Sequence, residues 1–107
     1  RLRLDAATAT RRYTNPGMHQ PGKDLVQGME VVITPDITVD PDEIIAAAVD
    51  AGLAYSEQLT RETSLVVCNQ EGELRGKAVH ARRKGIPLVS DTEFMQLTQN
   101  VRAGTAE

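Results

Sequence analysis

The sequence predicts a small α/β layer sandwich, and three observations lead to this prediction. Short apolar or β-branched runs alternate along the chain with longer segments of helical character. Two of the helical segments begin at Asp or Ser caps, and two end at glycine. A chain of 107 residues, 40% hydrophobic and 25% charged, is long enough for one domain with a modest core but not for two. We therefore expect the order strand, helix, strand, strand, helix, strand, helix, with a mostly parallel sheet covered on both faces.

The first strand and the first helix follow from two adjacent patterns. The run "MEVVIT" (29–34) is short and β-branched, as buried strands are. Asp40 is expected to cap the following helix, with Pro41 in the first position and Glu43 closing a capping box. The helix should end at Gly52, because glycine adopts the left-handed conformation of a helix cap without strain.

The middle of the chain repeats this alternation. Residues 53–58 are compatible with a short strand, and residues 64–69 form a stronger strand pattern. The second run is apolar on both faces, as strands of parallel sheets are. A helix is expected over 77–84, and Gly85 should end it in the left-handed conformation.

The last strand and the last helix are predicted at 86–90 and just beyond. Pro87 has no N–H for a sheet ladder, so this strand should lie at or near an edge. Ser90 and Glu93 have capping-box spacing, which predicts a helix start. The apolar residues that should face inward from this helix are Phe94, Met95, Leu97 and Val101.

The two ends of the chain lack these patterns. Residues 1–28 are poor in apolar periodicity and carry turn signals at 15–17 and 21–23. We interpret 1–28 as a lead-in or linker segment, partly ordered at best, 29–101 as the domain, and 102–107 as a tail. The lead-in carries a basic group formed by Arg1, Arg3, Arg11 and Arg12.

Composition excludes several function classes. No apolar run approaches the ~20 residues that span a bilayer, and no signal-peptide pattern opens the chain, so we expect no membrane partner. The single cysteine, Cys68, fits a reducing compartment such as the cytoplasm and is expected to be a core thiol. His19 and His80 have no metal-ligand spacing around them. We therefore expect no catalytic residue, no metal site and no cofactor, and a net charge of −3 gives no general attraction to polyanions.

The run "TSLVVCN…GKAVHARRKGIPLVSDTEF" resembles the second half of a BRCT domain. The family pattern is a strand entered through Thr or Ser, then a helix with Lys near its start and Ala four residues later. Gly ends that helix, and an Ile/Val-Pro strand with an acidic cap before an aromatic follows. The matching positions are Ser64 to Cys68, Lys77, Ala81, Gly85, Ile86 to Val89, Asp91 and Phe94. The resemblance covers about 29–100. Phe94 stands where many eukaryotic members carry Trp. The versions from bacterial NAD-dependent DNA ligases also have Phe at this position, which indicates the bacterial type.

This resemblance implies a three-layer sandwich around a four-stranded parallel sheet in the order 2-1-3-4. The first and third helices would lie on one face and the second helix on the other. It also implies a non-catalytic interaction module of a DNA replication or repair protein.

Some BRCT domains bind phosphate through a Thr/Ser-Gly pair after the first strand and a Lys at the start of the second helix. Thr34 and Lys77 match these positions, and Arg75 stands close enough to add a charge. A hydroxyl and an ammonium at a helix N-terminus suit an anion. Two features depart from the pattern. Pro35 replaces the glycine and has no N–H to donate. The first helix opens with the acidic residues Asp40, Asp42 and Glu43.

The cations of the second helix also have a purely structural interpretation. Lys and Arg stand at 75, 77 and 82–84, with no carboxylate between Leu74 and Ser90. Cations in the last turn of a helix stabilise its dipole by ~0.3–1 kcal/mol without any ligand. We favour this explanation for Arg82, Arg83 and Lys84.

Two functional hypotheses follow. In the first, the domain tethers a bacterial replication or repair protein to a protein partner, and the parent is of the DNA polymerase III epsilon exonuclease type. A DNA ligase parent is disfavoured by the long lead-in and the missing Thr-Gly pair. In the second, the domain docks a DNA end or 5′-phosphate through Thr34, Arg75 and Lys77. The basic lead-in favours the second hypothesis, because in a relative, the clamp-loader large subunit, an added N-terminal segment helps to grip DNA. We slightly favour a role as an inter-domain linker for the lead-in of this chain.

Overall fold

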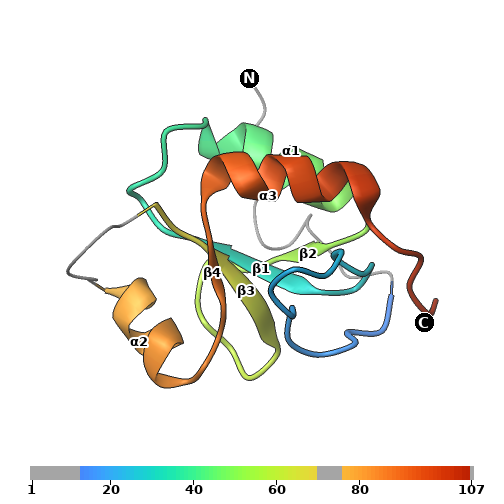
Figure 1. Cartoon of the computed structure of the whole chain (residues 1–107), viewed down its shortest axis with the longest axis horizontal. Helices are drawn as coiled ribbons and strands as arrows, with labels where there is room; N and C mark the ends of the chain where they lie inside the picture. The colour runs from blue at the N-terminus through green and yellow to red at the C-terminus, as the bar shows by residue number, and fades with distance from the viewer. Residues whose placement is uncertain (1–12, 70–75, 107) are drawn as a thin grey trace.

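The computed structural model describes residues 13–69 and 76–106, and it shows the predicted α/β sandwich (Figure 1). The elements in chain order are β1 (Glu30–Ile33), α1 (Pro41–Asp50), β2 (Ala54–Tyr55), β3 (Thr63–Val67), α2 (Lys77–Arg83), β4 (Leu88–Val89), α3 (Asp91–Leu97) and a 3₁₀ turn, η1 (Thr98–Asn100). The strands form one sheet in the order β2-β1-β3-β4, and each neighbouring pair is parallel. The predicted order 2-1-3-4 is confirmed.

The two faces of the sheet carry different helices, as the resemblance implied. On one face, Val31 and Leu65 of the sheet pack with Ile44 of α1 and Phe94 of α3. On the other face, a smaller cluster joins the strands to α2. Its buried members are Val32, Val66, Cys68, Ala78, Ala81 and Ile86. In Figure 1, α1 and α3 lie above the sheet and α2 lies below it at the left. Cys68 is a buried core thiol, as predicted.

Local capping signals predicted the helix ends well. The Asp40 side chain accepts a hydrogen bond from the Asp42 N–H at 3.0 Å, with Pro41 in the first turn. The Ser90 hydroxyl accepts from the Glu93 N–H at 3.2 Å at the start of α3. Glycines 52 and 85 have φ angles of +90° and +75°, which is the left-handed conformation expected after a helix.

All four strands are shorter than the sequence predicted, and the second and fourth differ most. The strand expected over 53–58 stops at Tyr55, because Ser56 turns the chain by donating from its hydroxyl to the Gln58 carbonyl at 2.7 Å. The strand expected over 86–90 is reduced to Leu88–Val89, because the Ile86 N–H still bonds to the end of α2 and Ser90 already caps α3. β4 is an edge strand, as Pro87 suggested.

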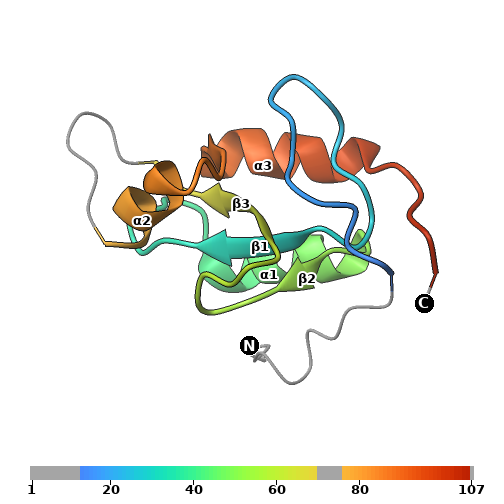
Figure 2. The ribbon, with the colours of Figure 1, turned by 90° about the horizontal axis from the view of Figure 1, so that it is seen from below.

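The part of the lead-in that the structure describes, 13–28, packs against the body of the domain. Leu25 is fully buried in the main core. The Arg102 N–H donates to the Leu25 carbonyl at 2.8 Å, and the Thr14 N–H donates to the Thr105 carbonyl at 2.8 Å. Residues 13–28 and 101–106 therefore lie side by side (Figure 1 and Figure 2). The domain boundary placed at residue 29 stays a prediction.

The helices in the described part of the chain are all too short or too polar to cross a bilayer.

Candidate functional site

Thr34, the first residue predicted to bind phosphate, lies at the carboxyl end of β1. Only 2% of Thr34 is exposed. Its backbone N–H donates to the Val67 carbonyl at 3.0 Å, and its hydroxyl lies 3.1 Å from the same oxygen. The hydroxyl also contacts the Asp36 carboxylate in a short hydrogen bond. A hydroxyl has only one proton to donate. The Thr34 hydroxyl, which was expected to donate to a phosphate, already donates to an acceptor within the chain.

Lys77 begins α2, at the same carboxyl edge of the sheet. Its ammonium donates to the carbonyl oxygen of Glu57, just beyond β2. Thr34 and Lys77 thus share an edge of the sheet, but each has its own partner there. Arg75 lies outside the residues that the structure describes.

The charge around Thr34 is negative. Asp36 contacts the Thr34 hydroxyl through one oxygen, and its other oxygen lies 3.8 Å from the Cys68 sulfur. Asp42 and Glu43 in the first turn of α1 follow later in the sequence. An anion that binds the Thr34 hydroxyl would have to displace the Asp36 carboxylate. Within 13–69 and 76–106, His, Cys, Asp and Glu side chains do not gather in threes as a metal site would require.

α2 presents a basic outer face. Ala78 and Ala81 are buried against the sheet, whereas His80, Arg82 and Arg83 are exposed. His80 is therefore solvated. The last turn of α2 is basic, and this arrangement stabilises the helix dipole without a ligand.

Asp91 has a structural role that sequence reasoning missed. The pattern identified it only as an acidic residue at the start of α3. In the structure Asp91 is 2% exposed, and one carboxylate oxygen accepts from the Thr38 N–H (2.7 Å), the Thr38 hydroxyl (2.8 Å) and the Val39 N–H (2.8 Å). Its other oxygen accepts from the Thr92 N–H at 2.7 Å. Asp91 thereby ties the loop between β1 and α1 to the start of α3.

These hydrogen bonds control the ionisation of Asp91. The Val39 N–H holds the pKa of the Asp91 carboxyl well below its usual range, and bonds from Thr38 add to this effect. Burial acts in the opposite direction but is outweighed. Asp91 is therefore a charged structural anchor at neutral pH.

The BRCA1 C Terminus (BRCT) domain family matches residues 21–97. The chain belongs to the BRCT family. No curated protein and no solved structure is similar to it at a significant level. The match begins at residue 21, within the stretch predicted as lead-in and before β1. BRCT domains are non-catalytic modules that generally bind proteins or phosphopeptides in DNA repair. The bacterial type indicated by Phe94 stays a prediction.

Proposed function

We propose that this BRCT domain tethers a bacterial DNA replication or repair protein to a protein partner in the cytoplasm. Membership of the BRCT family supports the interaction role. For the parent protein we propose a DNA polymerase III epsilon-type exonuclease. This choice rests on the resemblance and on Pro35, which replaces the glycine of the Thr-Gly pair.

The observation that carries the tethering role is the contact between Thr34 and Asp36. A carboxylate within hydrogen-bond reach of the Thr34 hydroxyl occupies the place that a phosphate oxygen would take. Like charges at such a site repel each other, and displacing Asp36 would also cost its hydrogen bond. This supports protein tethering over phosphate capture.

The alternative is a DNA-end or 5′-phosphate module that uses Thr34, Arg75 and Lys77. The exposed cations of α2 favour it, because they would supply backbone phosphate contacts beside Lys77. The position of Lys77 at the start of α2 also fits this role, because the phosphate-binding Lys of the family stands there.

A chemical-shift titration with two DNA duplexes separates the two functions. One duplex carries a recessed 5′-phosphate, and the other is identical but lacks it. Tethering predicts weak binding, micromolar or poorer, with little difference between the duplexes. A clear preference for the phosphorylated duplex that Lys77→Ala removes, and that Arg83→Ala leaves intact, would establish the alternative instead.

Substitution of Asp36 tests the reason for this expectation. If its carboxylate excludes phosphate, Asp36→Asn should increase affinity for the phosphorylated duplex relative to the unphosphorylated one. Asp50→Asn is the matched control, because it removes the same charge from the exposed far end of α1. An equal gain in both variants would show only a general reduction of negative charge.

A further inference from the structure

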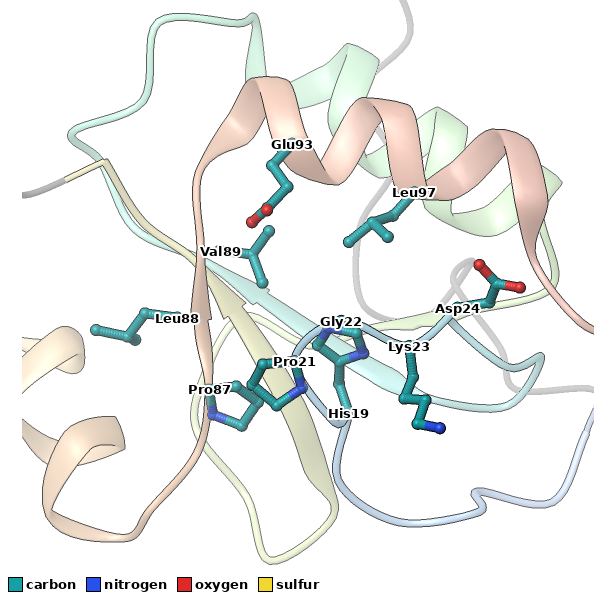
Figure 3. A pocket seen from close by; sticks show the side chains of 10 residues that line it. All are labelled: His19, Pro21, Gly22, Lys23, Asp24, Pro87, Leu88, Val89, Glu93 and Leu97. Carbon is teal, nitrogen blue, oxygen red and sulfur yellow. The ribbon is translucent and has the colours of Figure 1, made fainter.

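A cavity of about 200 Å³ lies beside β4, at the edge of the sheet (Figure 3), and Thr34 does not line it. Its walls come from the 19–24 turn, from the β4 segment and from α3. The apolar part of the lining includes Pro21, Pro87, Val89 and Leu97. Sites for small-molecule ligands usually measure ~300–1,000 Å³, so this cavity suits a single long side chain better than a cofactor.

The cavity adjoins an open strand edge. β4 is the last strand of the sheet and pairs only with β3 among the described strands. The Val66 N–H donates to the Pro87 carbonyl at 3.0 Å, and the Cys68 N–H donates to the Val89 carbonyl at 2.7 Å. In a parallel ladder, the N–H and C=O of the intervening residue, Leu88, therefore face away from β3. They are available to an extended peptide that adds to the sheet.

His19 lines the cavity and is a buried polar residue. Only 4% of His19 is exposed, and among the described residues its Nδ1 has no hydrogen-bond partner. Burial lowers the pKa of His19, whereas the charge of Glu93 acts to raise it. The imidazole is therefore neutral at neutral pH, and one of its nitrogens is a hydrogen-bond acceptor.

Glu93 gives the cavity a negative charge. It projects from α3, and its carboxylate points toward Val89 and the interior of the cavity (Figure 3). The Lys23 ammonium points away from the cavity in the same view. Asp24 forms an ion pair with Arg102 at 3.4 Å. Among the described residues that line the cavity, Glu93 is thus the charged residue that points into it and has no ion-pair partner.

We propose that this cavity binds the basic side chain, Lys or Arg, of a partner peptide that lies extended along the free edge of β4. The apolar stem of the side chain packs against Pro21, Pro87 and Leu97, and its cationic group donates to the Glu93 carboxylate beside the neutral His19 ring. Leu88 supplies the main-chain hydrogen bonds that fix the register. This inference rests on the proposed tethering function. It identifies the surface through which the domain would bind its protein partner, and the basic side chain that the partner would present.

The test uses blocked pentapeptides of sequence Thr-Val-X-Val-Thr, with X as Arg, Lys, Gln or Glu, titrated into the whole chain and followed by amide chemical shifts. The Arg and Lys peptides should shift the amides of Leu88, Val89 and Glu93. The Gln and Glu peptides should bind about tenfold more weakly or worse, the scale of one charge-assisted hydrogen bond. Methylation of the peptide nitrogen that faces Leu88 should remove binding, because strand addition needs that donor.

Two variants locate the charge recognition. Glu93→Gln should weaken the Arg and Lys peptides about tenfold and bring them level with the Gln peptide. The backbone N–H of residue 93 still donates to the Ser90 hydroxyl in this variant, so α3 keeps its N-terminal cap. Glu43→Gln is the matched control on α1, and it should leave peptide affinity unchanged because Glu43 does not line the cavity.

Equal binding of all four peptides, shifts confined to residues away from β4 and α3, or no binding at all would overturn the assignment. So would a Glu93→Gln variant with unchanged affinity. The duplex titration judges the tethering function separately, because it depends on the Thr34 region and not on Glu93 or His19.

Discussion

Replacing Asp91 by asparagine should lower the free energy of unfolding by about 3 kcal/mol at pH 7. Three donors, two from Thr38 and one from Val39, converge on one buried carboxylate oxygen. A hydrogen bond to a charged group contributes ~1.5–3 kcal/mol to stability, and a bond between neutral groups contributes ~0.5–1.5 kcal/mol. Each of the three bonds should therefore contribute about 1 kcal/mol less once the charge of Asp91 is removed. The amide NH₂ would also face the Thr92 N–H, which now donates to the second carboxylate oxygen.

Urea denaturation at 25 °C measures this loss. The midpoint should fall while the slope with denaturant stays constant, because the substitution changes little buried area. Asp50→Asn removes the same charge from an exposed position at the end of α1 and should stay within ~0.5 kcal/mol of the unaltered chain.

The pH dependence gives an independent check. The folded pKa of Asp91 is lowered, so its contribution is fully present above the usual pKa of 3.8 and is lost as pH falls below that value. The stability difference between the unaltered chain and Asp91→Asn should therefore shrink below pH 3.8. A variant within ~0.5 kcal/mol of the unaltered chain at pH 7 would refute the anchoring role, as would a difference independent of pH.

Three further outcomes are expected. Phe94 is fully buried, so Phe94→Ala should cost ~3–5 kcal/mol in denaturant melts, and a loss under ~1 kcal/mol would contradict its place in the core. Gly85→Ala should cost ~1 kcal/mol in the same assay because φ there is +75°, and an unchanged midpoint would remove that reason. The folded pKa of His19 is lowered, so the unfolded chain binds more protons just below pH 6.5, and stability should fall as pH drops through this window. His19→Gln should flatten that part of the stability curve, and a slope that survives the substitution would assign it to another group.

The fold was predictable because its signals are local. The caps at Asp40 and Ser90, the glycine at 85 and the β-branched runs each depend on residues within a few positions of one another. The strand order came from the BRCT resemblance, since periodicity does not specify which strands are neighbours.

The missed features depend on partners distant in sequence. Asp91 bonds to residues more than fifty positions earlier, and nothing in its own neighbourhood indicates this. His19 lies in a turn-rich stretch without periodicity, and this stretch docks on β3, where the His19 N–H donates to the Ser64 carbonyl. Asp36 differs, because a carboxylate two residues after Thr34 is a local signal that the hydroxyl already has an acceptor.

The pairing of residues 13–28 with 101–106 constrains how the domain could be joined to other domains. The two paired segments lie together at one end of the molecule, and α2 lies at the other end (Figure 1). Polypeptide continuing from either segment would depart from nearly the same place, so the domain would project sideways from its neighbours instead of standing between them in a row. Small rotations at that single attachment would carry α2 through a wide arc, while β4 and its cavity, nearer the middle of the molecule, would sweep a shorter one.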